Sequence, residues 1–384
     1  MRVWAATGAG LCGSLVGIGL ARFAYSPLIP ALIAAGWFTP AGAAYLGAAN
    51  LAGYLAGAVA AQWVVRRMGA RRALRAMMLL ATAAFFACAW RLGFGWFFVW
   101  RFASGVSGGV IMVLGATLVL PHVALARRGV AGGVIFTGVG LGIVASGTLV
   151  PLLLRLGMAG TWLGLGALCG ALTAAAWFGW PRVDIAEHGK AGTGRLGRAA
   201  WAVIVEYGLN AAGLVPSMIF LVDFIARGLG WGVAVGSAFW VLYGLGATVG
   251  PLVLGRVADR IGFRLALRIG FLVQAAAALL PVVTHRAAWL GVSSVVVGGF
   301  TPGMVLLVLG RLHEVVPRAG QRRAWGYATV SFGVFQAAAA YAYSAVFARE
   351  GGSYRVIFAA GVVATLIALA LDCVADREPE ETLA

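Results

Sequence analysis

A single arginine, Arg22, lies deep within the first long apolar segment of the chain, followed by the run Phe23-Ala24-Tyr25-Ser26-Pro27. A guanidinium near the centre of a bilayer costs at least a few kcal/mol, so a charge at this depth marks a functional site. Its planar fork of donors suits a carboxylate or a phosphate. If the segment is helical, Tyr25 and Ser26 follow on the same face and add hydroxyl donors. We therefore expect Arg22, Tyr25 and Ser26 to bind a negatively charged substrate.

A second deep arginine, Arg101, lies about one helical turn inside another apolar segment. Gly105 and Gly108 continue its helical face and would let a neighbouring helix or a ligand approach closely. Two roles stay open for Arg101. It contacts the substrate, or it serves proton coupling or bonds between helices.

The only deep carboxylate is Glu206, with Asn210 four residues later on the same helical face. A carboxyl group in a low-dielectric environment can exchange protons near neutral pH, which makes Glu206 the candidate proton carrier. The alternative is a salt bridge from Glu206 to an arginine of a nearby loop. Asn210 is a candidate substrate ligand.

Polar and aromatic side chains interrupt other aliphatic segments at mid-depth. Trp240, Tyr243 and Gln336 are candidate substrate ligands, and Asn50 and Phe332 are similarly placed. The alternatives are aromatic packing and hydrogen bonds between helices.

Composition defines the elements that must position these residues. Hydrophobic residues make up 62% of the 384 residues and charged residues 11%, and the mean hydropathy is +0.94. Soluble domains carry roughly a quarter charged residues, so this composition indicates an integral membrane protein. The cysteines and histidines are scattered, so we expect no metal site and no cofactor.

Twelve apolar segments are long enough to cross a bilayer as helices. The first begins with Arg2 but lacks a small-residue cleavage site before Arg22, so we interpret it as a span. The expected spans are 4–34, 41–64, 73–90, 94–120, 131–154, 161–180, 201–225, 232–254, 265–284, 288–310, 324–347 and 355–374.

The basic residues predict the orientation. Loops after even-numbered spans hold nineteen of them, and loops after odd-numbered spans hold six. By the positive-inside rule, the even loops and both termini face the cytoplasm. The net charge of +17 then reflects topology and contact with lipid headgroups. No motif supports nucleic-acid binding.

The two halves of the chain resemble each other. A shift of 193 positions superposes Gly53 on Gly246 and Gly57 on Gly250. We therefore expect two pseudo-symmetric six-helix bundles, 1–180 and 201–384, joined by a cytoplasmic linker, 181–200. Such repeats are typical of secondary transporters, whose substrate site lies near the membrane midplane between the halves.

One loop carries a specific motif. Residues 255–264, GRVADRIGFR, resemble motif A of the major facilitator superfamily, with Gly255, Asp259, Arg260, Gly262 and Arg264 at its positions. The matching first-half loop has Arg66 in place of the aspartate. In this superfamily the motif-A aspartate closes the cytoplasmic side, so the resemblance implies a one-sided latch in which Asp259 docks near residues 129–133.

Three weaker motifs agree with this resemblance. Arg101-Phe102-Ala103-Ser104-Gly105 is similar to motif B, with serine in place of glutamine, and residues 138–147 are similar to the antiporter motif C without its proline. The run from Arg22 to Pro27 resembles the YbfB/YjiJ branch of the superfamily. The resemblance implies that spans 1, 4, 7 and 10 line one cavity, with both deep arginines around it.

We therefore expect a multi-pass secondary transporter of the bacterial inner membrane, a monomer that moves a small organic anion by alternating access, with protons as the coupling ion. A multidrug or metabolite exporter is the alternative, favoured by the motif C remnant. A membrane sensor without transport is a second alternative, and it would need a signalling domain that the sequence does not show. No catalytic constellation indicates an enzyme.

Overall fold

The computed structural model describes residues 2–124, 127–181, 196–349 and 352–375. All of the regular elements in these ranges are helical, as membrane-crossing segments must be when their backbone groups bond internally. In chain order they are α1 (Arg2–Ser14), the π-helix η1 (Leu15–Leu20), α2 (Tyr25–Ala34), α3 (Pro40–Met68), α4 (Ala70–Ala87), α5 (Phe94–Val119), η2 (Leu120–His122), α6 (Arg128–Leu153), η4 (Leu154–Leu156), α7 (Gly157–Ala176), α8 (Arg198–Asp223), the π-helix η5 (Phe224–Gly228), α9 (Gly232–Ile261), α10 (Phe263–Val283), α11 (Ala287–Val315), α12 (Arg318–Arg349) and α13 (Tyr354–Ala375).

The predicted spans match these helices to within a few residues, with one correction. The first span is not one continuous helix, because η1 and a turn at 21–24 separate α1 from α2. Local signals explain several boundaries elsewhere. Thr39 caps α3 by accepting a hydrogen bond from the Gly42 amide, with Pro40 at the first helical position.

Ten segments of the described chain are long and apolar enough to cross a membrane. One of these, Ala131–Ala176, contains both α6 and α7. Helix α4 falls outside the ten, since Arg71, Arg72 and Arg75 lower the hydropathy of its 18 residues. With α6 and α7 separated and α4 included, the described chain has the twelve spans expected for an all-α membrane protein.

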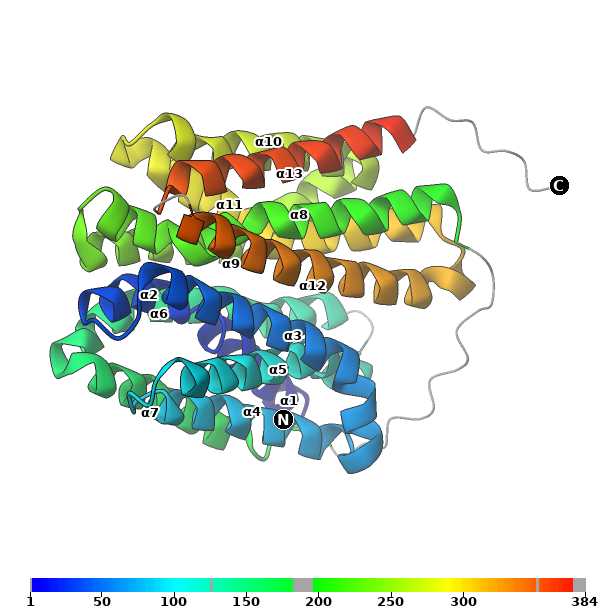
Figure 1. Ribbon diagram of the computed structural model, residues 1–384. Coiled ribbons are helices and arrows are strands. Elements are labelled where there is room, and N and C mark those ends of the chain that lie inside the picture. The colour runs from blue at the N-terminus through cyan, green and yellow to red at the C-terminus, as the bar shows by residue number, and fades with distance from the viewer. Residues whose placement is uncertain (1, 125–126, 182–195, 350–351, 376–384) are drawn as a thin grey trace.

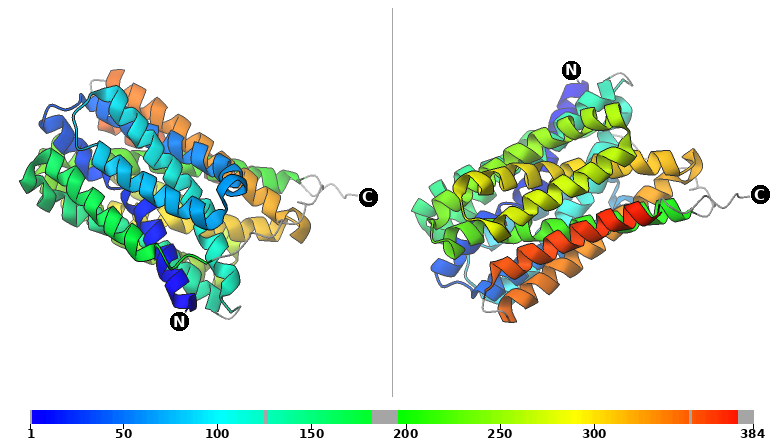
Figure 2. Two further views of the ribbon diagram at one scale, coloured as in Figure 1. Left: turned by 90° about the horizontal axis from the view of Figure 1, so that it is seen from below. Right: turned by 90° about the horizontal axis from the view of Figure 1, so that it is seen from above.

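The helices form two groups that lie side by side. In Figure 1, α1 to α7 fill the lower half and α8 to α13 the upper half, and both views of Figure 2 show the long helices running roughly in one direction. Between the groups, α3 packs against α12, α6 packs against α9, and α2 contacts α8. The expected linker at 181–200 lies mostly outside the described residues.

The internal repeat appears in the packing of equivalent helices. A Cβ atom on Gly53 would lie 2.1 Å from the Phe102 carbonyl oxygen, and one on Gly246 would lie 2.0 Å from that of Val295. The glycines and their partners are each 193 positions apart, so α3 approaches α5 as closely as α9 approaches α11. Small residues permit such close helix contacts in membranes.

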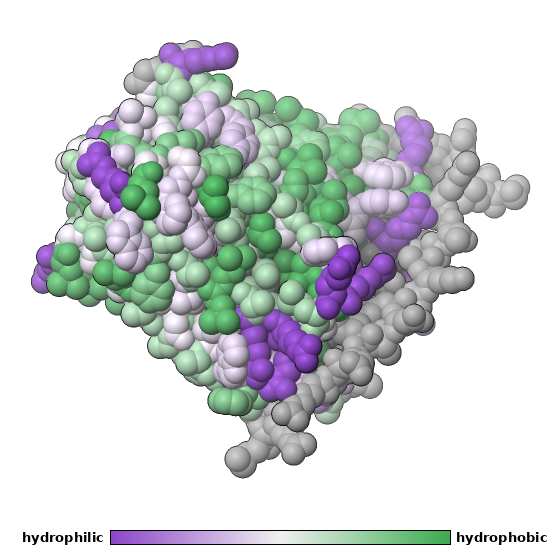
Figure 3. All heavy atoms as spheres, turned by 60° about the horizontal axis from the view of Figure 1, so that its bottom comes forward, coloured by the Kyte–Doolittle hydropathy of each residue, from purple (hydrophilic) through white to green (hydrophobic). Residues whose placement is uncertain are grey.

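The outer surface agrees with a lipid environment. On the face in Figure 3, apolar residues spread over a broad central area and strongly hydrophilic residues gather toward the edges. Many large exposed side chains are apolar, including Trp63, Phe178 and Val99. This amount of exposed apolar surface is typical of a face covered by lipid.

Candidate substrate cavity

A large cavity lies between the two groups of helices, with a volume of about 2640 Å³. Its wall includes residues of α3, α5 and α6 from the first half and of α8, α9, α11 and α12 from the second. Arg22 lines it at mid-depth, and Arg66, Arg71 and Arg72 line it where α3 turns into α4. We call the end of the molecule with these three residues the arginine-rich end. No aspartate or glutamate of the described chain lines the cavity.

The Arg22 guanidinium contacts a thioether sulfur and two aromatic rings, and it forms no ion pair with a described residue. One guanidinium nitrogen donates to the Met218 sulfur at 3.4 Å, and the Phe23 and Tyr54 rings each lie 5.1 Å from its central carbon. The Nε atom is buried without a hydrogen-bond partner. Within the described residues no carboxylate pairs with Arg22. The charge is therefore available to an anionic ligand in the cavity.

The break in the first span positions this arginine. The amide of Ala21 bonds to the Val16 carbonyl five residues back, which is the wide spacing of a π-helix. Such bulges occur often at functional sites because they shift the side chains that follow. The register of Arg22 relative to α1 thus depends on η1.

Tyr25 and Ser26 make bonds between helices. The Tyr25 hydroxyl donates to the Ala43 carbonyl at 2.9 Å, and the Ser26 hydroxyl donates to the Met218 carbonyl. Ser26 thus shares a neighbour with Arg22, as the helical spacing predicts, whereas Tyr25 points toward α3. Both hydroxyls stabilise the packing of α2 in this conformation, and their contact with substrate stays a prediction.

Arg101 lies behind Arg22 in a buried polar network. It is 3% exposed, donates to the Ala21 carbonyl at 2.9 Å and lies 4.3 Å from the Tyr25 ring centre. The Asn50 amide joins the same group through Ser104 at 2.8 Å and the Arg101 carbonyl at 3.1 Å. Arg22 and Arg101 share a small pocket of about 20 Å³, but only Arg22 lines the large cavity.

Glu206 and Asn210 lie fully buried on α8, away from the cavity wall. Neither the Glu206 carboxylate nor the Asn210 amide has a hydrogen-bond partner within the described residues. Arg268, Arg311 and Asp372 lie within electrostatic range of Glu206, yet no arginine of the described chain forms the alternative salt bridge with it. Proton transfer by Glu206 and substrate binding by Asn210 stay predictions.

The other three candidates, Trp240, Tyr243 and Gln336, do not line the cavity in this conformation. The Trp240 ring donates to the Ser146 hydroxyl at 3.2 Å and stacks on Tyr243 at 4.8 Å. Tyr243 shares a hydrogen bond with Thr301, which does line the cavity. Gln336 donates to the Met218 sulfur at 3.4 Å, so Met218 accepts from Gln336 and from Arg22. These residues support the wall in this conformation.

Several cavity residues escape prediction from the sequence. Tyr54 on α3 and Tyr207 on α8 line the cavity, and their hydroxyls form no hydrogen bond within the described chain. Phe332 and Trp325 on α12 lie next to Tyr207, with ring centres 4.6 Å and 6.0 Å away. Among these four residues, only Phe332 is a candidate from the sequence. A polar aromatic residue inside an apolar span was the available signal.

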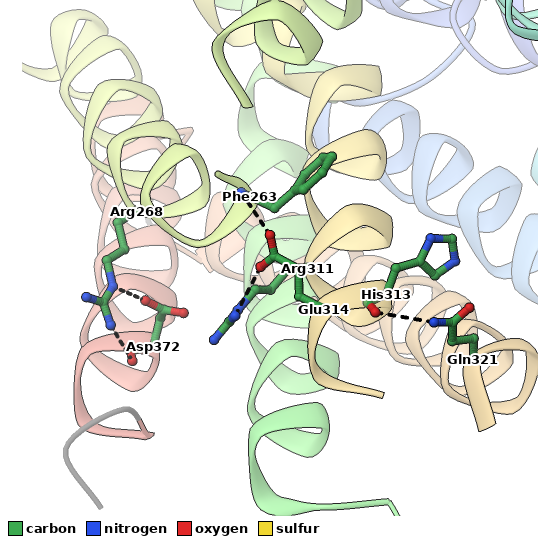
Figure 4. Close-up of polar contacts among 7 residues, drawn as sticks. All are labelled: Phe263, Arg268, Arg311, His313, Glu314, Gln321 and Asp372. Carbon is green, nitrogen blue, oxygen red and sulfur yellow. Dashed lines mark hydrogen bonds and ion pairs between the residues drawn. The ribbon is translucent and has the colours of Figure 1, made fainter. Parts of the chain in front are cut away.

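The motif-A loop lies at the arginine-rich end. Asp259 is exposed and forms no ion pair or hydrogen bond with any described residue, while Gly262 turns the chain with φ of 80°. The docking of Asp259 near residues 129–133 stays a prediction. Figure 4 shows a neighbouring group, in which Glu314 accepts from the Phe263 amide at 3.3 Å and from Arg311 at 3.1 Å.

The two bundles lie side by side with a central cavity between them, which is an architecture that membrane transporters use. The chain belongs to the major facilitator superfamily, because a family model described as "Uncharacterised MFS-type transporter YbfB" matches residues 14–372. A solved structure titled "Crystal structure of D-xylose-proton symporter" has a TM-score of 0.71 with this chain. The alignment covers 96% of this chain and 97% of that one at 16% identity, so the likeness concerns the fold. No curated protein matches the chain significantly.

Proposed function

We propose that this transporter moves a small organic anion across the bacterial inner membrane by alternating access. The observation that carries the proposal is the Arg22 guanidinium, which faces the central cavity without a carboxylate partner in the described chain. A charge at this depth requires compensation. Since the described cavity wall has no acidic residue, the substrate itself is the source of negative charge.

The basic mouth of the cavity supports the same proposal. Arg66, Arg71 and Arg72 line the entrance at the arginine-rich end. Clefts lined by one sign of charge raise the local concentration of the opposite ion. Arg66 takes the place of the motif-A aspartate, so the substitution that weakens the first-half latch also adds positive charge to the entrance.

The positive-inside rule assigns the arginine-rich end to the cytoplasm. The cavity then faces inward, and the contact of α2 with α8 through Ser26 and Met218 closes the outer side. Movement of the two halves about the α3/α12 and α6/α9 contacts would open the outer side and close the inner one.

Proton coupling through Glu206 is part of the proposal. A fully buried carboxyl group without a hydrogen-bond partner in the described chain has a strong energetic reason to bind a proton. It lies on α8, the helix that also carries Met218, so its protonation acts on an element that contacts Arg22. Coupling would therefore pass through α8 and not through a direct contact with substrate.

A multidrug or metabolite exporter is the second candidate function, favoured by the resemblance of residues 138–147 on α6 to the antiporter motif. This segment packs closely against helices of both halves. A Cβ atom on Gly142 would lie 2.4 Å from the Gly19 Cα atom, and one on Gly140 would lie 2.2 Å from the Thr248 hydroxyl. These close contacts fall within the segment that resembles the antiporter motif. Residues 138–147 lack the proline of motif C, so an antiporter function requires this segment to work without that residue.

A thermal-shift panel on the purified protein tests the anion proposal. Sodium acetate, benzoate, succinate and phosphate are compared with benzamide and benzylammonium chloride at constant ionic strength. At least one anion should raise the melting temperature, because a ligand that binds the native state stabilises it by mass action. The shift should vanish in Arg22→Ala. Stabilisation by the cation alone, or by no anion, would contradict the proposal.

A further inference from the structure

We infer that the substrate is a singly charged carboxylate with a flat apolar body, such as an aromatic monocarboxylate. This inference rests on the proposed function and narrows it in two ways, by charge and by shape. The distribution of arginines along the wall limits the charge, and the aromatic residues near Arg22 limit the shape.

The cations of the cavity wall are unevenly distributed, with three arginines at the mouth and one away from it. Arg22 is the only charged residue of the described wall away from the mouth. It contacts Tyr54 on α3, and Arg66 follows on the same helix twelve positions later. At 1.5 Å per residue, that separation is about 18 Å along the helix axis.

A small ligand bound to Arg22 therefore cannot reach Arg66. The second charge of a dicarboxylate, or the extra charge of phosphate, would lie in the cavity among wall side chains that carry no compensating cation, because Arg101 lies behind the wall and donates to the Ala21 carbonyl. Alternating access requires the site to close, and closure removes the water that would solvate such a charge. An unpaired charge in a water-poor site is costly, so the wall selects for a single negative charge.

Aromatic residues near Arg22 limit the shape of a ligand that can bind there. Phe23 and Tyr54 flank the guanidinium in the first half, with both ring centres 5.1 Å from its central carbon. Across the cavity, Tyr207 packs with Phe332 and Trp325 as a row on α8 and α12. We call Tyr207, Phe332 and Trp325 the aromatic row.

The aromatic row and Arg22 line the same cavity. Tyr207 lies within electrostatic range of both Arg22 and Tyr54. Aromatic rings favour offset-stacked or edge-to-face contact with other rings. A carboxylate on Arg22 would thus bring an attached ring against the aromatic row.

The free hydroxyls of Tyr54 and Tyr207 complete the arrangement. Neither hydroxyl bonds to the described chain, unlike those of Tyr25 and Tyr243. Each can donate one hydrogen bond to a carboxylate oxygen that the arginine leaves unsatisfied. The site therefore offers the planar guanidinium of Arg22, two hydroxyl donors and a flat aromatic wall.

Calorimetric titration of the purified full chain with named probes tests the inference. Benzoate should bind about 100-fold more tightly than acetate, because burial of the ring adds apolar contact area. Benzamide has the same shape without the charge, and terephthalate adds a second carboxylate to the same ring. Both should bind at least about 10-fold more weakly than benzoate.

Variants of the aromatic row provide the second arm. Tyr207→Ala should weaken benzoate binding about 10-fold more than it weakens acetate binding, because acetate loses only the hydroxyl hydrogen bond, whereas Tyr207→Phe keeps the ring and should lose less. Tyr327→Ala is the matched control. Tyr327 stacks on Trp201 outside the cavity wall, so this change should affect neither ligand. Thermal melts of each variant without ligand identify any loss of folding.

The outcomes separate this inference from the proposed function. If succinate or phosphate binds more tightly than benzoate and depends on Arg22, the anion proposal stands and the monocarboxylate inference is wrong. Equal binding of acetate and benzoate, or no effect of Tyr207→Ala on folded protein, also overturns the inference alone. If no anion binds, both are wrong.

Discussion

Replacement of Arg22 by alanine is the most direct perturbation of the proposed site. A bidentate pair between the guanidinium and a carboxylate provides two charge-assisted hydrogen bonds, each worth about 1.5–3 kcal/mol. Loss of both should weaken binding by about 3–6 kcal/mol, roughly a 10²- to 10⁴-fold change in Kd. The protein itself should lose little stability, since Arg22 contacts only a thioether and two rings in the described chain.

The assay is calorimetric titration with sodium benzoate and with any other anion that raises the melting temperature of the parent. Arg22→Lys keeps the charge but not the planar fork, so its affinity should fall between those of the parent and Arg22→Ala. Arg155→Ala is the control for loss of a positive charge, because Arg155 is exposed in η4, directly after α6, and has no partner in the described chain.

One result would refute the reasoning. An Arg22→Ala protein that folds normally and binds the anion with unchanged affinity would show that the buried guanidinium does not form the anion site. If Arg22→Lys binds the anion as tightly as the parent does, a positive charge at this position is sufficient and bidentate geometry is not required.

Three further predictions concern coupling, gating and packing. Glu206→Gln should abolish the pH dependence of uptake into proteoliposomes and retain counterflow exchange, since exchange moves no net proton; pH-driven uptake at the parent level would make Glu206 structural. Asp259→Asn should raise cysteine labelling of inner cavity positions and lower that of outer ones, and Arg66→Asp should do the reverse; labelling identical to the parent in Asp259→Asn would exclude a gating role. Gly246→Ala should destabilise the fold by about 1–3 kcal/mol through overpacking against α11, measured by thermal melts in detergent, whereas Gly95→Ala, whose Cβ would meet no atom within 4 Å, should melt like the parent.

Much of the architecture followed from the sequence alone. The apolar runs are long and separated by arginine, glycine and proline, so the span boundaries were recognisable without tertiary contacts. The 193-residue repeat was also visible, because close helix contacts require glycine at matching positions. The first span was the exception, since a π-helix differs from an α-helix by one backbone register and leaves no clear compositional signal.

The candidate site also has one part that the sequence predicts and another that only the tertiary structure decides. Arg22 was predictable because a charge inside an apolar run is costly wherever the run lies in the bundle. The rotation of each helix about its own axis was not predictable, because every face of these helices is largely apolar. Tertiary packing alone therefore decided that Tyr207 faces the cavity while its neighbour Glu206 faces the interior of the second half. It also directed Tyr25 to a carbonyl on α3 and left the hydroxyl of Tyr54 free, since hydrogen-bond partners from distant helices consume some polar groups and leave others for a ligand.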